Sequence, residues 1–221
     1  MTVPNDIHMP EHISTSRFVE LAQDPESVAR QIRRPMPQRP TAAAREGTLV
    51  HEWIEQFYAR NMPGLTPSFD IEETEQLVDA DWDQATGLAE LRERFQASQW
   101  AQRVPVMIEA AVETSVLGLT LRGRIDAVFR TGGDPDIDFD PAATWELVDW
   151  KTGRIPPDRE MPQRSLQLAI YRLAWSRLHN IPLENITGRF VYIAHGVEKT
   201  PHDFASEKEL ETILLKAFGE R

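Results

Sequence analysis

Residues 145–153, WELVDWKTG, place a carboxylate and an ammonium two positions apart, at Asp149 and Lys151. The apolar start of this stretch predicts a buried strand, and the Thr-Gly pair predicts its end. Because side chains alternate along a strand, Asp149 and Lys151 should share one face. Val148 and Trp150 should share the opposite face. The acid and the amine would then stand side by side where a core strand reaches the surface.

A second strand-like run, residues 121–129, carries one carboxylate near its middle, Asp126. Beside Asp149 on a neighbouring strand, it would form an oxygen-lined site for a hard cation, with Lys151 next to it. Phosphodiester hydrolysis needs an attacking water, neutralisation of charge on the phosphate oxygens and help for the leaving oxygen. Mg²⁺ or Mn²⁺ held by carboxylates can supply all three, and an ammonium can stabilise the anionic oxygens. Lys151 should also lose proton affinity beside a cation, which leaves a role as general base open.

Each feature alone has a common structural explanation. An Asp-x-Lys pair on a strand is usually a surface ion pair with nothing bound. His51 begins His-Glu-x-x-Glu within a predicted helix, which differs from the zinc-protease His-Glu-x-x-His, and a single helical His is more often structural than a ligand. Gln167 and Tyr171 share a face of another predicted helix, but they could be boundary positions beside its core stripe.

Taken in order, six residues resemble the motif set of the RecB-type branch of the PD-(D/E)XK nuclease superfamily: His51, Asp126, Asp149, Lys151, Gln167 and Tyr171. The resemblance runs from about residue 14 to about residue 202. It is strongest to the nuclease module at the C-terminus of UvrD/Rep-type helicases in actinobacterial double-strand-break resection enzymes.

The resemblance implies a role for each member of this set. The metal would be held by three side chains and one backbone carbonyl: His51, Asp126, Asp149 and the carbonyl of Trp150. Gln167 and Tyr171 would line the active site and contact substrate phosphate or bridge the metal shell. One imidazole with two carboxylates suits Mg²⁺ or Mn²⁺, and the nitrogen favours Mn²⁺.

Five further charged residues near these motifs have no settled role. Arg124, Arg154 and Arg164 are hypothetical DNA contacts, and solvated arginine is the alternative for each. Glu109 and Glu113 precede Asp126 on a predicted strand, and either could supply another carboxylate. Their spacing does not decide which one faces the site.

The order of the predicted elements defines the fold class. Helices are expected at residues 17–21, from 25 to before 35, 41–60, 88–95, 160–179 and 206–218, and strands at 104–116, 119–129, 145–151 and 189–195. The strands around Gly118 should form a hairpin. The aspartate-rich loop at 132–140 lacks the Gly and Glu of an EF-hand, so it is interpreted as a solvated hairpin tip. The result is an α/β (α+β) sandwich, a central mixed sheet flanked by helices. The resemblance implies the same restriction-endonuclease-like arrangement.

The 221 residues are expected to form a single nuclease domain. Residues 1–40 would form a helical and basic strap, 41–205 the core and 206–221 a C-terminal helix. The strap is the most basic segment and a candidate for contact with backbone phosphates, although a solvated basic loop is more common. Residues 63–83 are acidic and rich in turn formers, which predicts a surface insertion.

Composition excludes several classes of protein. The chain contains no cysteine, which rules out disulfides, Cys-ligated zinc and Cys-ligated iron–sulfur clusters. It contains no Gly-x-x-x-x-Gly-Lys-[Ser/Thr] loop, so no nucleotide is expected to bind. A cytoplasmic location is expected, because no signal peptide or membrane-length apolar stretch is apparent. The net charge of −11 argues against a free-standing DNA binder, so a partner should deliver the DNA.

These observations favour a Mg²⁺- or Mn²⁺-dependent deoxyribonuclease that cuts single-stranded DNA as a UvrD/Rep-type helicase, in the same or another polypeptide, unwinds it. A stand-alone nuclease resembling the CRISPR-adaptation type is one alternative, which the missing Cys cluster and the weakly basic surface disfavour. A catalytically silent module that guides DNA or docks a partner is another. The complete motif set argues against it.

Overall fold

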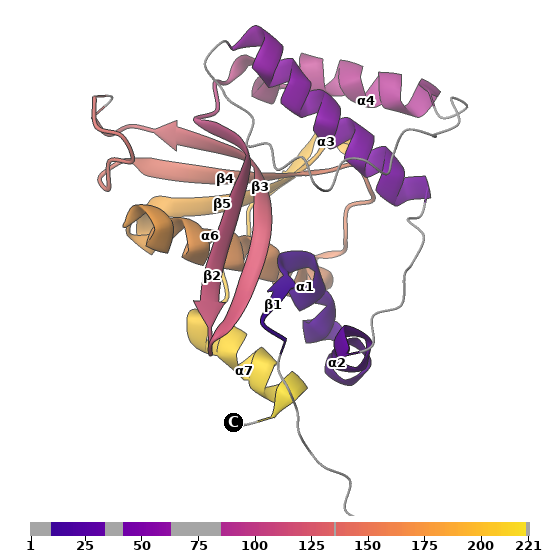
Figure 1. Ribbon diagram of the computed structural model, residues 1–221. Helices are drawn as coiled ribbons and strands as arrows, with labels where there is room; N and C mark the ends of the chain where they lie inside the picture. Colours follow the sequence, from indigo (N-terminus) through magenta and orange to yellow (C-terminus); the bar gives the residue numbers. More distant parts are fainter. Residues whose placement is uncertain (1–9, 34–41, 63–84, 135, 220–221) are drawn as a thin grey trace, which may run out of the picture.

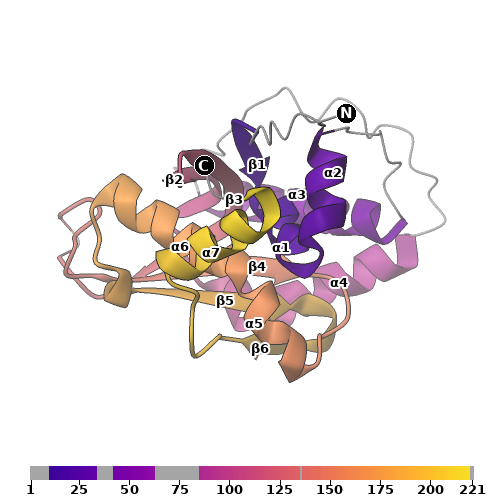
Figure 2. The ribbon, with the colours of Figure 1, turned by 90° about the horizontal axis from the view of Figure 1, so that it is seen from below.

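The computed structural model describes residues 10–33, 42–62, 85–134 and 136–219. A six-stranded mixed sheet lies at its centre, with helices on both faces (Figure 1; Figure 2). The strands are β1 His12–Ser14, β2 Met107–Val116, β3 Leu119–Thr131, β4 Thr144–Lys151, β5 Ile186–Tyr192 and β6 Val197–Lys199. The helices are α1 Thr15–Gln23, α2 Pro25–Arg33, α3 Ala42–Asn61, α4 Ala85–Ala97, α5 Met161–Arg164, α6 Leu166–His179 and α7 Glu207–Phe218.

The longest strand, β3, organises the sheet. Along one edge it pairs with β2 in the hairpin that the sequence predicts, and the turn residues Leu117 and Gly118 both have positive φ, at 51° and 74°. Its other edge pairs in parallel with β1 near its start and antiparallel with β4 near its end. Strand β4 then pairs in parallel with β5, and β5 pairs antiparallel with β6.

Helices cover both faces of the sheet, which confirms the predicted sandwich. Figure 1 shows α3 and α4 above the sheet and α6 with α7 below it. The predicted alternation along β4 is also confirmed. Leu147 packs in the core cluster with α6, whereas Val148 and Trp150 pack in the cluster with α3 and α4. The face of β4 that carries Asp149 and Lys151 is therefore the α6 face.

Several predicted boundaries were wrong. The expected helix 160–179 is broken into α5 and α6 at Ser165, where the Ser165 hydroxyl donates to the carbonyl of Pro162 over 2.7 Å. The expected strand 104–116 begins only at Met107. The expected strand 189–195 spans 186–192 and then enters a 3₁₀ turn that ends at Gly196, φ 60°, where the chain reverses into β6.

Some predictions are only partly covered by the described residues. The basic strap beyond residue 33 and the acidic segment 63–83 lie outside them. The division of a single domain into 1–40, 41–205 and 206–221 stays a prediction. Among the described helices, none is long and apolar enough to cross a membrane.

Helix α7, which the sequence predicts at residues 206–218, begins with a capping box at Ser206. The Ser206 hydroxyl accepts from the backbone of Glu209, whose carboxylate accepts from the Ser206 backbone over 2.8 Å. Replacing Ser206 by Ala should lower the free energy of unfolding by about 1 kcal/mol. Urea denaturation measures the change. The exposed Lys208→Ala on the same helix is the control, and an equal effect of both substitutions would contradict the capping role.

Candidate active site

The site lies where β3 and β4 diverge. The β3–β4 pairing ends at Ala127 and Val148, while β4 continues beside β5 as far as Lys151. Between its pairings with β1 and β4, residues 123–126 of β3 have no strand partner on that edge within the described chain. The carboxylate of Asp126 spans this fork, because its Oδ2 accepts the backbone N–H of Trp150 over 2.6 Å. The fork thus opens the sheet beside both predicted aspartates.

Three potential metal ligands gather at the fork: His51, Glu109 and Asp126. One ligand atom from each lies within 4.8 Å of the others. His51 projects from α3, which is anchored on the sheet by the buried side chains of its neighbours Val50 and Ile54. Its Nδ1 lies 3.3 Å from Asp126 Oδ1. Its Nε2 lies 3.1 Å from the carbonyl oxygen of Trp150. The predicted carbonyl therefore reaches the same cluster.

Glu109 is the cluster member that could not be chosen from the sequence, which left it and Glu113 as alternatives. The β2–β3 register places it opposite Asp126, and the backbone there adopts φ 49°, which is strained for a non-glycine residue. The hairpin turn held the missing signal, because counting outward from the two turn residues, Leu117 and Gly118, pairs residue 109 with residue 126. Glu113 instead pairs with Arg122 at 3.2 Å, and both side chains are exposed.

Asp149 and Lys151 form a second group on the α6 side. Lys151 Nζ lies 2.6 Å from Asp149 Oδ2, so the ammonium and the buried carboxylate form a close ion pair. Lys151 also donates to Gln167 Oε1 over 3.3 Å, and Gln167 donates to the Tyr171 hydroxyl over 2.9 Å. Thr15 donates to that hydroxyl over 3.4 Å. Asp149 does not join the three-ligand cluster.

The two groups interact electrostatically. Burial opposes a charged imidazole, but the charges of Asp126, Asp149 and Glu109 outweigh it and raise the pKa of His51 to about 9. Burial, together with the charge of Asp126, raises the pKa of Glu109 to about 8. Burial likewise raises the pKa of Asp149 to about 6, although Lys151 opposes the rise. The cluster therefore holds protons that a cation would displace.

Lys151 and Tyr171 keep their protons at neutral pH. Burial would lower the pKa of Lys151, but the Asp149 carboxylate outweighs it, so the pKa lies above its usual value. Burial also raises the pKa of Tyr171, and the charges of Asp149 and Asp126 add to the rise. Without a cation, Lys151 is therefore a charged donor rather than a base.

Stability measured in EDTA should fall as the pH rises from 6 to 9. Folding raises the pKa of Glu109 from 4.5 to about 8 and that of His51 from 6.5 to about 9. The folded chain then holds more protons than the unfolded one, and raising the pH removes the stability that these protons confer. Thermal unfolding at pH 6, 7.5 and 9 measures the effect.

Glu109→Gln is the matched variant for that experiment, and its unfolding temperature in EDTA should depend less on pH. Saturating Mn²⁺ should stabilise the wild-type chain more at pH 9 than at pH 6, because fewer protons compete with it. An unfolding temperature in EDTA that rises across this range would contradict the assignment.

Gly123 allows Tyr171 to approach β3. A Cβ at this position would lie 2.5 Å from Tyr171 Cε1 and 2.8 Å from Thr15 Cγ2. We expect Gly123→Ala to displace Tyr171 and destabilise the fold by about 1–3 kcal/mol. Gly153→Ala is the control, because a Cβ there meets nothing within 4 Å. Chemical denaturation compares the two, and equal stability would contradict the close approach.

Two clefts reach the site from either side of the start of α1. One, of about 790 Å³, is lined by the three potential ligands together with Arg122, Arg124 and Tyr171, among others. The other, of about 450 Å³, is lined by Lys151, Gln167, Arg154 and Arg164, among others. All three arginines that the sequence singled out thus line a cleft at the site. Their contact with DNA stays a prediction.

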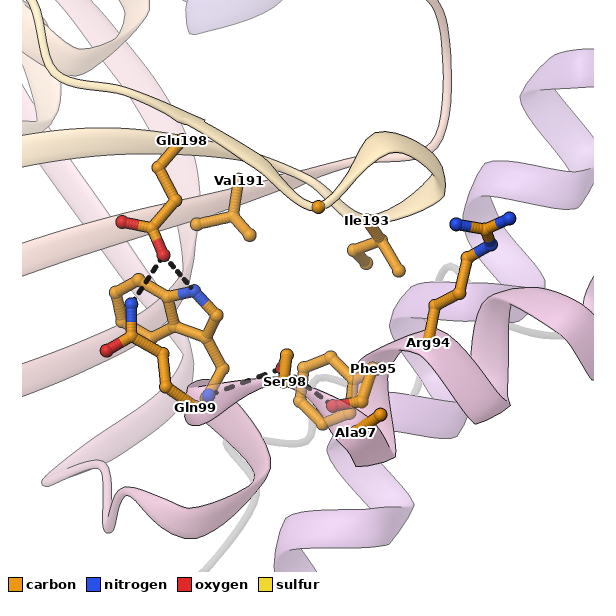
Figure 3. A pocket seen from close by; sticks show the side chains of 10 residues that line it. Arg94, Phe95, Ala97, Ser98, Gln99, Val191, Ile193 and Glu198 are labelled. Atoms are coloured by element: carbon orange, nitrogen blue, oxygen red, sulfur yellow. Dashed lines mark hydrogen bonds between the residues drawn. The ribbon is translucent and has the colours of Figure 1, made fainter.

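A third pocket, of about 490 Å³, lies between α4 and the β5–β6 turn (Figure 3). The carboxylate that lines it, Glu198, already accepts from Trp100 Nε1 over 2.9 Å and from Gln99 Nε2 over 2.6 Å. The other lining residues are largely apolar, and none of the six motif residues reaches it. This pocket therefore lacks the groups that hydrolysis needs.

A mixed sheet that brings carboxylates and a lysine to a strand fork, with a histidine facing them from α3, has the architecture of a nuclease. The family profile of the PD-(D/E)XK nuclease superfamily matches residues 26–217, and the chain belongs to this superfamily. Superfamily members generally use divalent metals. A comparison with curated proteins finds none that matches the chain.

One solved structure with a TM-score above 0.5 shows a similar fold. An inferred exonuclease from Eubacterium rectale superposes with a TM-score of 0.53 at 11% identity, over 98% of this chain and 82% of that one. A protein designated SSO0001 gives a TM-score of 0.44 at 14% identity, over 95% of this chain and 76% of that one. At these identities the likeness concerns the fold alone.

The residues at the fork fit a divalent cation. Carboxylate and carbonyl oxygens with one imidazole are suitable donors for Mg²⁺ or Mn²⁺. The raised pKa of His51 reflects the negative charges of Asp126, Asp149 and Glu109 around it, whereas that of Glu109 is raised first by burial and then by the charge of Asp126. Asp149 adds a buried carboxylate beside the fork, and its charge also acts on His51. Together these features describe a site that a cation would complete.

Proposed function

We propose that the chain is a RecB-type, Mg²⁺- or Mn²⁺-dependent nuclease that hydrolyses phosphodiester bonds of single-stranded DNA. The observation that carries the proposal is the cluster of His51, Glu109 and Asp126 beside the buried pair of Asp149 and Lys151. Membership of a nuclease superfamily supports the reaction class. The ordered motif set supports the finer assignment to the RecB-type branch.

The metal would be held by His51, Glu109, Asp126 and the carbonyl of Trp150, with Asp149 as the adjoining carboxylate. When bound, the cation lowers the pKa of water and neutralises charge on phosphate oxygens. Glu109 and Asp126 come from directly opposed positions on paired strands, and the Asp126 carboxylate is fixed by its bond from the Trp150 N–H. The donors are therefore arranged before substrate arrives, which reduces the reorganisation needed during the reaction.

Lys151 is the chain's own electrophilic group. Its ammonium lies between Asp149 and Gln167, at the inner end of the smaller cleft. From there it can donate to a non-bridging oxygen of the scissile phosphate, on which negative charge grows as water attacks phosphorus. Gln167 fixes the ammonium and is itself bonded to Tyr171, which rests on Gly123. We assign Gln167 and Tyr171 the task of orienting Lys151 and the phosphate.

Single-stranded DNA is the proposed substrate because the ordered motif set resembles that of helicase-associated nucleases, which implies it. The net charge of −11 gives the chain little general attraction for DNA. A UvrD/Rep-type helicase, in the same or a partner polypeptide, would supply the single strand during double-strand-break processing.

Strand preference tests this proposal. Purified chain should degrade a labelled single-stranded oligonucleotide in Mn²⁺ and leave a blunt duplex of the same sequence largely intact. Adding a UvrD/Rep-type helicase with ATP should make the duplex a substrate. Equal cleavage of duplex and single strand without the helicase would contradict the single-strand assignment while preserving the nuclease.

A further inference from the structure

The smaller cleft is more basic than the acidic chain around it. It runs from Lys151 and Gln167 at its inner end to Arg154 and Arg164, and these residues come from β4, the loop after it and the α5–α6 segment. Its lining carboxylate, Glu20, is already paired with Arg17 at 2.5 Å. The cleft therefore presents cations next to the group proposed to bind the scissile phosphate.

Arg154 and Arg164 converge on a single carboxylate. Glu160 Oε2 lies 3.6 Å from Arg154 Nη2 and 3.8 Å from Arg164 Nη2. Both distances are too long for hydrogen bonds, and neither guanidinium makes a hydrogen bond elsewhere in the described chain. The side chains of Arg154, Arg164 and Glu160 are 72, 46 and 33% exposed. Glu160 therefore holds the two guanidinium groups close together and leaves their N–H donors available.

Lys151 and Arg164 both act electrostatically on Tyr192. Burial raises the pKa of Tyr192, and the positive charges of both Lys151 and Arg164 oppose that rise. Tyr192 lines the same cleft. Lys151 and Arg164 thus both lie within electrostatic reach of Tyr192 in this cleft.

We propose that Arg154 and Arg164 form a second phosphate subsite, which binds a phosphate of the substrate strand next to the scissile bond, and that Glu160 holds the pair until the phosphate replaces it. The proposal rests on the proposed nuclease function. Guanidinium groups bind phosphate through paired N–H donors, which an ion pair at more than 3.5 Å leaves available. A phosphate entering the pair meets repulsion from Glu160, so Glu160 should weaken binding while it keeps the arginines in place.

The test measures binding of a fluorescent single-stranded oligonucleotide in EDTA, where no hydrolysis occurs. The double variant Arg154→Gln/Arg164→Gln should raise Kd at least about tenfold and reduce the slope of log K against log salt by about 0.7, as expected for one lost phosphate contact. Glu160→Gln should tighten binding several-fold. Arg159→Gln, which removes one positive charge, is the control, since Arg159 is exposed, lies in the same segment and does not line the cleft.

Three results would overturn the subsite. The first is no oligonucleotide binding by the wild-type chain. The second is a fold-change in Kd for the double variant no larger than the square of that for Arg159→Gln, which is what two unspecific charge losses would give. The third is weaker binding by Glu160→Gln. Oligonucleotides with a 5′-phosphate, a 3′-phosphate or neither distinguish a terminal phosphate from an internal one, and arginine-dependent binding of any of them supports the subsite. The nuclease function is judged separately by cleavage in Mn²⁺. Cleavage with an unchanged KM in the double variant removes the subsite and leaves the nuclease. Arginine-dependent binding without cleavage leaves the subsite and removes the nuclease.

Discussion

Asp126→Asn should abolish metal-dependent cleavage and leave the chain folded. An amide oxygen can still accept the Trp150 N–H that Asp126 Oδ2 accepts over 2.6 Å, so the bond across the fork can survive. The amide removes the negative charge that faces His51 and Glu109. A loss of about 4 kcal/mol of transition-state stabilisation corresponds to a roughly 10³-fold fall in kcat/KM.

The cleavage rate of a labelled single-stranded oligonucleotide measures this effect, and Mn²⁺ titration calorimetry should show weaker binding in parallel. Asp138→Asn is the matched control, because it makes the same charge change on an exposed loop. Activity that survives in Asp126→Asn at the level of Asp138→Asn would exclude Asp126 from the site.

Lys151→Met should lower kcat about 10²- to 10³-fold, the usual cost of removing one donor to a developing anion. It should also destabilise the chain, by up to about 3–5 kcal/mol, because the buried Asp149 loses its counter-charge. The double variant Asp149→Asn/Lys151→Met should recover much of this stability and remain inactive. A double variant that is stable but inactive would show that Lys151→Met loses activity because the ammonium is missing, and not because the chain unfolds.

Lys199→Met is the control for the lysine substitution. Lys199 pairs with Asp158 at 3.2 Å, but the Asp158 side chain is 90% exposed. Removing the Lys199 ammonium should therefore cost little stability. Single-turnover cleavage and thermal unfolding of the four proteins provide the comparison. A Lys151→Met variant with wild-type turnover would show that the ammonium takes no part in the reaction.

Much of the scaffold could be predicted from local sequence. The alternation in residues 145–151 correctly placed Val148 and Trp150 on the face opposite Leu147, because a strand with a period of two and two buried faces leaves little freedom. The β2–β3 hairpin followed from one Gly between two apolar runs. The last helix, expected at residues 206–218, is found there as α7.

What could not be predicted depends on contacts between distant segments. Strand β1 has only three residues, and it forms by pairing with β3, which lies more than one hundred positions away in the sequence. Glu109 reaches the cluster from a left-handed backbone conformation, which simple alternation does not anticipate. The break at Ser165 depends on a side-chain bond to the carbonyl of Pro162. The fork that exposes Asp126 arises where two strand pairings end.

Metal-dependent cleavage by the wild-type chain tests the central claim most directly. A labelled single-stranded oligonucleotide should be cut in Mn²⁺ and remain intact in EDTA, and Asp149→Asn should leave it intact in both. If the wild-type chain binds Mn²⁺ at the fork but never cuts the oligonucleotide, alone or with a helicase and ATP, the chain is not the nuclease proposed here.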